Sequence, residues 1–162
     1  MARERKPEFK PLSFSTTMRN PSRIADFLIC ILPYEGQILT NDIIHNIVAS
    51  LIRKKLYKPV YINRTPKLKD VLSAERDFTD AEVEEIMKHS PQNHKEAGFD
   101  KGWPSRFDTW YKLPMEFGFV YYKMNSPIII STTGHMLIDA HKEKPANDEK
   151  IKNVFLNALT KY

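Results

Sequence analysis

Apolar residues recur at helical spacing in the first third of the chain. Asn20 and Pro21 form a helix start, with the asparagine as N-cap and the proline at the first helical position, and Pro33 closes the segment. Thr40 is expected to cap a second helix that continues to about Lys55. The spacing of three and four residues predicts two amphipathic helices, with apolar positions at Ile24, Phe27, Leu28, Ile31, Ile43, Ile44, Ile47, Val48, Leu51 and Ile52.

The middle of the chain mixes strand and helix signals. The segment from Tyr57 to Thr65 is rich in β-forming residues and predicts a short strand. Thr79 and Glu82 then form a capping box, in which each side chain accepts a hydrogen bond from the other residue's backbone N–H. The box predicts a short acidic helix whose inward face comprises Val83, Ile86 and Met87. A polar stretch from Ser90 to Pro104 follows, and its glycines indicate an ordered loop.

A short amphipathic helix is predicted from Ser105 to Leu113. Ser105 can cap it, and Pro114, which lacks a backbone N–H, should end or kink it near Leu113. One face is apolar and comprises Phe107, Trp110 and Tyr111. The other face is left for solvent or a partner and carries Arg106, Thr109 and Lys112.

A hairpin and two more helices complete the pattern. Residues 119–123 and 128–131 are rich in β-formers and predict paired strands with a tip at residues 124–127. Thr132-Thr-Gly134 opens the next helix, and the last begins after Asn147. The apolar face of the last helix comprises Ile151, Val154, Phe155, Ala158 and Leu159. The order helix, hairpin, helix predicts a mainly α fold with a small β-hairpin, a winged helix (a helix-turn-helix with a wing) of the kind that binds DNA.

The moderate excess of positive charge is compatible with a polyanionic partner and does not by itself establish one. The 162 residues carry a formal net charge of +5, and hydrophobic residues make up 41%, enough for one folded domain. We expect residues 1–11 to be a flexible basic arm and residues 12–162 to be a single domain. Between Arg53 and Lys69 there are seven basic residues and no acidic one, whereas between Glu75 and Asp100 eight acidic residues stand against three basic ones. This asymmetry favours directional docking.

Several classes of protein are disfavoured. Cys30 is the single cysteine, so no disulfide framework is possible, and we expect a buried thiol in a reducing compartment. There is neither a membrane-spanning apolar run nor a secretory signal, so a cytoplasmic location is expected. The acidic residues near Asp139 and Asp148 lie at or between predicted helix ends and do not form a magnesium-binding cluster. The five histidines lack zinc-ligand spacing. We therefore expect no cofactor and no catalysis by this chain alone.

Two stretches resemble the AlwI family of type IIS restriction endonucleases. The first runs from Leu12 to Leu28, contains Ser-Thr-Thr-Met-Arg-Asn-Pro, and is joined by Tyr34-Glu-Gly36. The second comprises Trp103-Pro-Ser-Arg-Phe-Asp-Thr-Trp110, Phe117-Gly-Phe-Val120 and Thr133-Gly134. The resemblance implies the N-terminal DNA-recognition part of a longer enzyme, a site-specific deoxyribonuclease that cuts outside a short asymmetric site. It also implies a separate magnesium-dependent cleavage domain, further towards the C-terminus, as a partner. The chain stops within helical pattern, as expected of a fragment.

On this interpretation the chain is a monomer that recognises double-stranded DNA without cutting it. Thr16, Thr17, Arg19 and Asn20 precede a helix N-terminus, a place suited to phosphate or base-edge contacts. Arg64, Lys67 and Lys69 are expected to contact phosphates, and Arg106 is expected to read a base. The remaining predicted DNA contacts are Lys101, Ser105, Thr109, Lys112 and Lys123.

Two other functions stay open at this point. A free-standing winged-helix transcription regulator would need a dimerisation surface, for which the helix from Ile151 to Leu159 is the candidate. We expect that helix face to pack on the core or on the cleavage domain instead. A protein-interaction module could use the acidic and basic faces to bind partner proteins.

Overall fold

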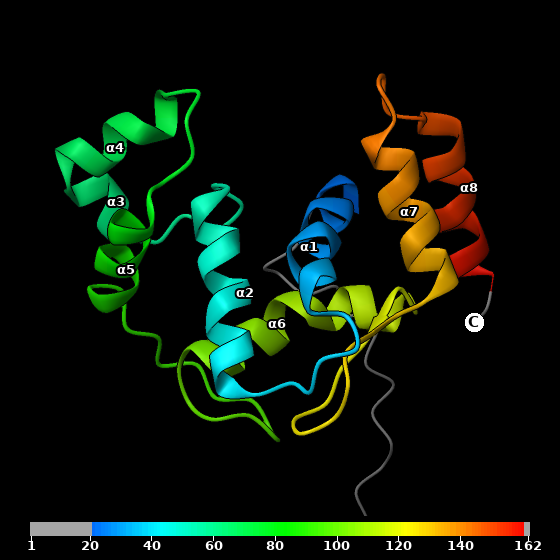
Figure 1. Cartoon of the computed structure of the whole chain (residues 1–162), viewed down its shortest axis with the longest axis horizontal. Helices are drawn as coiled ribbons and strands as arrows, with labels where there is room; N and C mark the ends of the chain where they lie inside the picture. Colours follow the sequence, from blue (N-terminus) through cyan, green and yellow to red (C-terminus); the bar gives the residue numbers. More distant parts are fainter. Residues whose placement is uncertain (1–20, 161–162) are drawn as a thin grey trace, which may run out of the picture.

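The computed structural model describes residues 21–160, which are mainly helical with one small antiparallel sheet (Figure 1). The first half contains the 3-10 helices η1 (Pro21–Arg23) and η2 (Leu32–Tyr34) and the α-helices α1 (Ile24–Ile31), α2 (Asn41–Arg53), α3 (Val60–Arg64) and α4 (Pro66–Ser73). The second half contains α5 (Asp80–Lys88), α6 (Trp103–Glu116), β1 (Val120–Tyr121), β2 (Ile129–Ile130), α7 (Thr132–Lys142) and α8 (Asp148–Leu159).

Helix α6 is the base on which α1 and α2 lie (Figure 1). Its predicted apolar face is confirmed, since Phe107, Trp110 and Tyr111 are at most 1% exposed. The hydroxyl of Tyr111 donates to the backbone oxygen of Phe27 on α1 at 2.8 Å. Cys30 is buried as predicted, and burial raises the pKa of its thiol to about 11. This part of the core is therefore built from helices that the apolar spacing identified.

The predicted hairpin is present with shorter strands. Strand β1 pairs antiparallel with β2, with Val120 opposite Ile130. Residues 36–39 run beside the far end of the hairpin, where Ile38 forms an isolated antiparallel bridge with Pro127. Its Gly36 N–H donates to the oxygen of Ile128 at 2.8 Å, and its Leu39 N–H donates to the oxygen of Ser126 at 2.9 Å. The hairpin is thereby fixed to the segment that joins α1 to α2.

Helices α7 and α8 form a pair beside α1 (Figure 1). Ser131 caps α7 by accepting from the N–H of Gly134 at 3.0 Å. Asn147 caps α8 by accepting from the N–H of Lys150 at 3.1 Å. Both helix starts were predicted, and so were the caps of α2 by Thr40 and of α5 by the capping box. Asn20 and residues 1–11, for which a cap and an arm were predicted, lie outside the described residues.

The strand predicted from Tyr57 to Thr65 is wrong. This segment forms α3, and the undetected helix α4 follows it directly. Pro59 precedes α3, and Pro66 opens α4, both places where a missing N–H costs little. Burial of Ile62 on α3 and of Leu68 on α4 holds the pair on the core. Tertiary packing therefore overrides the strand preference of the segment.

The predicted boundaries of α6 are also wrong. The helix begins at Trp103 with Gly102 at the N-cap, where φ is +105°, so Ser105 is not the cap. Pro114 does not end it, because the Phe117 N–H donates to the oxygen of Leu113 at 3.0 Å beyond the proline. One missing hydrogen bond inside a buried helix is tolerated where packing holds both flanking turns.

Candidate nucleic-acid interface

The predicted phosphate contacts Arg64, Lys67 and Lys69 are exposed on α3 and α4. We call these three residues the α3–α4 surface. The ammonium of Lys67 lies 3.7 Å from the carboxylate of Glu85 on α5. In Figure 1 this pair of helices lies at the opposite end of the molecule from α7 and α8. The α3–α4 surface is therefore a basic region set apart from the hairpin.

Part of the charge asymmetry is neutralised within the molecule. Arg53 at the end of α2 forms an ion pair with Asp80 on α5, and the ammonium of Lys55 donates to the oxygen of Ala74 at 2.6 Å. With the Lys67–Glu85 pair, two cations of the basic run meet carboxylates of the acidic run. The basic and acidic runs therefore pair partly with each other. Their separation in the sequence is for this reason a weaker indicator of an external partner.

Most of α6 is covered. Only Lys112 and Glu116 are exposed among its 14 residues. Ser105 is fully buried, with its hydroxyl donating to the oxygen of Asp100 at 2.7 Å and accepting from the N–H of Glu96 at 3.0 Å. These partners belong to the α5–α6 loop (residues 89–102), which lies over this part of the helix. The prediction that Ser105 contacts DNA is therefore corrected, since its buried side chain fixes this loop instead.

Arg106 packs against aromatic rings. Its guanidinium carbon lies 5.4 Å from the ring centre of Tyr57 and 5.6 Å from that of Trp110. The Nε is buried and has no hydrogen-bond partner within the described residues. Thr109 is half-buried, and its hydroxyl donates to the oxygen of Ser105 at 3.1 Å. Both side chains are thus engaged with the fold rather than projecting from an open helix face.

Lys112 lies in different surroundings from Arg106. Its ammonium is 3.8 Å from Glu96 and 4.0 Å from Asp108. Asp108 also accepts from the hydroxyl of Tyr122 at 2.9 Å, and burial raises the pKa of Asp108 above its ordinary value. The face predicted to carry Arg106, Thr109 and Lys112 together is therefore divided between two environments.

Lys112 and the hairpin meet through Asp108. Tyr122 bonds to this carboxylate, and the next residue, Lys123, is exposed. Lys101 is exposed directly before α6. We call Lys112 and Lys123 the α6–hairpin surface. The structure thus divides the predicted contacts into this surface and the α3–α4 surface.

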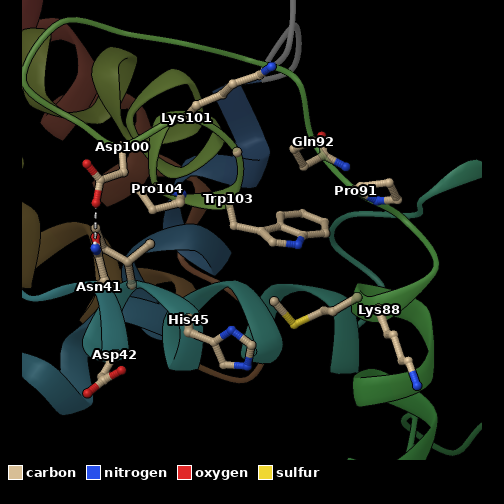
Figure 2. Close-up of a pocket in the computed structure, with 13 residues that line it drawn as sticks. Asn41, Asp42, His45, Lys88, Pro91, Gln92, Asp100, Lys101, Trp103 and Pro104 are labelled. Atoms are coloured by element: carbon tan, nitrogen blue, oxygen red, sulfur yellow. Dashed lines mark hydrogen bonds between the residues drawn. The ribbon is translucent and has the colours of Figure 1, made fainter.

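A pocket of about 600 Å³ opens between α2, α6 and the α5–α6 loop (Figure 2). Trp103 lies between His45 of α2 and the loop residues Pro91 and Gln92. The amide of Asn41 donates to the carboxylate of Asp100 at 2.8 Å across one end. Sequence reasoning missed this pocket, because its lining comes from three separate parts of the chain. The feature of the sequence that could have indicated the pocket is Trp103, which stands between Gly102 and Pro104.

Thr16, Thr17, Arg19 and Asn20, predicted to contact DNA, lie outside the described residues. Within residues 21–160, no group of three or more histidine, cysteine, aspartate or glutamate side chains is arranged to hold a metal ion. None of the helices in this range combines the length and apolar composition needed to cross a membrane. Comparison of the chain with models of protein families, with curated proteins and with solved structures finds no match.

Proposed function

We propose that this chain recognises double-stranded DNA as the specificity part of a type IIS restriction endonuclease of the AlwI family, and that it does so as a winged helix. The observation that carries the proposal is the order of the elements around the hairpin. Helix α1, residues 36–39, α2, α6, β1 and β2 occur in this order along the chain, with α3, α4 and α5 between α2 and α6. A winged helix places two helices and a recognition helix before its hairpin in this way.

Backbone pairing supports the same arrangement. Residues 36–39 hydrogen-bond to residues 125–128 of the hairpin, so a segment near the start of the fold joins the wing. Residues 54–102, with α3, α4 and α5, are then an insertion between the second and third helices. On this assignment α6 is the topological equivalent of a recognition helix, and β1 and β2 form the wing.

The burial of α6 decides how DNA would be contacted. Since the helix exposes only Lys112 and Glu116, it cannot lie lengthwise in a major groove with the α5–α6 loop in place. Lys112 and Lys123 remain available beside the hairpin, and cationic side chains there suit phosphate oxygens. The α3–α4 surface offers a second set of phosphate contacts. Cleavage belongs in this proposal to a separate magnesium-dependent domain.

A titration of variants tests the α6–hairpin surface. We expect the double variant Lys112→Ala/Lys123→Ala to bind a pool of random duplexes about tenfold more weakly than the unaltered chain, because two phosphate contacts are lost. Lys142→Ala/Lys152→Ala removes two exposed lysines from α7 and α8 and serves as the matched control. Fluorescence anisotropy of labelled duplexes measures both. Equal losses of affinity in the two double variants would show that Lys112 and Lys123 beside the hairpin do not contact DNA.

A further inference from the structure

We infer that the pocket between α2, α6 and the α5–α6 loop takes one unstacked nucleobase of a DNA strand. The inference rests on the proposed DNA binding and gives it a second mode, in which a base is held outside the duplex stack. It is carried by the shape of the pocket, the fixed tryptophan within it and the polar groups around it.

The size of the pocket suits a small planar ligand. Its volume of about 600 Å³ lies in the range of small-molecule sites. Helices α2, α5 and α6 and the α5–α6 loop line it. The hydrogen bond between Asn41 and Asp100 ties the start of α2 to the loop before α6. Two sides of this open surface pocket are therefore held together.

Trp103 provides a fixed aromatic surface. Its ring centre lies 6.1 Å from that of Tyr57, at an interplanar angle of 84°, and 6.4 Å from that of the buried Trp110. The indole is half-buried and lines the cavity between His45 and Gln92 (Figure 2). Tryptophan is the side chain on which an unstacked base packs well, because every base has an aromatic face.

Polar groups beside the ring match the edge of a base. The Gln92 amide nitrogen donates to the oxygen of Ser90 at 2.9 Å, which leaves its own oxygen as an acceptor. His45 is exposed on α2, and neither of its ring nitrogens has a hydrogen bond within the described residues. A donor or acceptor on each side of an aromatic surface is the arrangement with which proteins bind base edges.

Charged side chains around the pocket do not select the ligand, because Asp42 and Asp100 balance Lys88 and Lys101 in its lining. In Figure 2 the ammonium groups of Lys101 and Lys88 both point away from Trp103. The Asp100 carboxylate accepts a hydrogen bond from the Asn41 amide at 2.8 Å. The ring of Trp103 and the amide of Gln92 are therefore the groups that bind the base.

The test compares a duplex that contains a single-nucleotide bulge with the same duplex fully paired. We expect the unaltered chain to bind the bulged duplex at least about fivefold more tightly, and the preference to disappear in Trp103→Leu. Tyr121→Leu, which removes an aromatic ring that is 49% exposed on the hairpin, is the matched control and should retain it. Trp103→Phe keeps an aromatic ring and should retain part of the preference, even where the leucine variant fails to fold.

A second measurement needs no variant. Deoxynucleoside 5′-monophosphates should quench the tryptophan fluorescence of the unaltered chain, and the change is assigned to Trp103 because Trp110 is 1% exposed. Equal binding of bulged and paired duplexes overturns the pocket proposal and leaves the proposed DNA recognition intact. Absence of binding to any duplex overturns the proposed function. In that case the monophosphate titration still decides on the pocket, since absence of quenching contradicts it.

Discussion

Among single residues, Asp108 holds α6 and the hairpin together. Its side chain is buried between Tyr122, whose hydroxyl donates to it at 2.9 Å, and the ammonium of Lys112 at 4.0 Å. A buried carboxylate is stable in a fold only where donors or cations surround it. Burial raises the pKa of Asp108, while the bond from Tyr122 acts in the opposite direction. The tyrosine is therefore a structural partner of the carboxylate.

Replacement of Tyr122 with phenylalanine isolates that hydrogen bond. We expect Tyr122→Phe to lower the free energy of unfolding by about 1–3 kcal/mol, because a buried acceptor loses its donor. Tyr121→Phe removes a hydroxyl from the neighbouring exposed tyrosine and should change the value by less than about 0.5 kcal/mol. Urea denaturation measures both. Similar values for the two variants would show that the Asp108 carboxylate is satisfied in another way.

Residue roles were predictable where they depend on neighbours in sequence. Thr40 and Thr79 cap their helices as predicted, because an N-cap bonds to a backbone N–H three residues later. Asn147 caps α8, which was predicted to begin directly after it. Ser105 was predicted to do the same but bonds to Glu96 and Asp100, whose position depends on how the α5–α6 loop folds. The pocket around Trp103 was missed for the same reason.

At the scale of elements, the approach of α7 to the hairpin depends on a glycine. An added Cβ at Gly134 would lie 2.3 Å from the backbone oxygen of Phe119 and 2.8 Å from the side chain of Ile130. Both neighbours are buried, and the Phe119 contact is with backbone, which cannot rotate away. Only a residue without a side chain lets the first turn of α7 pack so closely on the sheet.

Substitution of this glycine should separate α7 from the sheet. We expect Gly134→Ala to lower the free energy of unfolding by about 1–3 kcal/mol, the usual effect of overpacking in a core. Thr132→Ala, at an exposed position in the same helical turn, is the control and should change it by less than about 0.5 kcal/mol. Thermal or urea unfolding measures both. A neutral or stabilising Gly134→Ala would contradict the close contact.

The capping box of α5 predicts a dependence on pH. The side chain of Arg76 hydrogen-bonds to Glu82 and, with the Thr79 N–H, lowers the pKa of Glu82 from its usual 4.5 to about 2. A carboxyl whose pKa is lower in the folded state stabilises the fold above its unfolded pKa. That contribution is lost as the pH falls from about 4.5 towards 2.

Glu82→Gln should therefore lower the free energy of unfolding by about 1 kcal/mol at neutral pH, the usual contribution of a helix cap. The difference from the unaltered chain should shrink as the pH falls through this range. Glu84→Gln changes an exposed glutamate of the same helix and provides the control. Denaturation at a series of pH values gives the measurement. A difference that does not vary with pH would exclude ionisation of Glu82 as the cause.

Helices and strands were predicted best where the repeating apolar pattern extends over many residues. Helices α1 and α2 carry continuous apolar ladders, and α8 packs its Val154 and Ala158 against the core as expected. The five-residue α3 is too short to show a helical period, so its β-forming residues indicated a strand. Its helical state depends on burial of Ile62 in the assembled fold.

At the scale of the whole molecule, the net charge is +5, and the fold brings oppositely charged segments of the chain together. Acidic α5 packs near the basic segment, where Arg53 and Lys67 form ion pairs with it. Exposed cations remain at Arg64 and Lys69 on the α3–α4 surface and at Lys123 on the α6–hairpin surface. Exposed lysines also lie elsewhere, among them Lys54, Lys58 and Lys142. Neither surface could be derived from the charge runs alone. The basic and acidic runs are separate in the sequence, but in the folded chain they lie together and partly neutralise each other.

The salt dependence of binding to duplex DNA tests the central claim most directly. If about four phosphates are contacted, the affinity of the chain for a random-sequence duplex should fall about 100-fold between roughly 50 mM and 200 mM salt, because bound counterions are released. Anisotropy titrations at these two concentrations measure the change. A steep fall of this size agrees with recognition of DNA through a cationic surface, whereas no binding at low salt, or an affinity independent of salt, would contradict it.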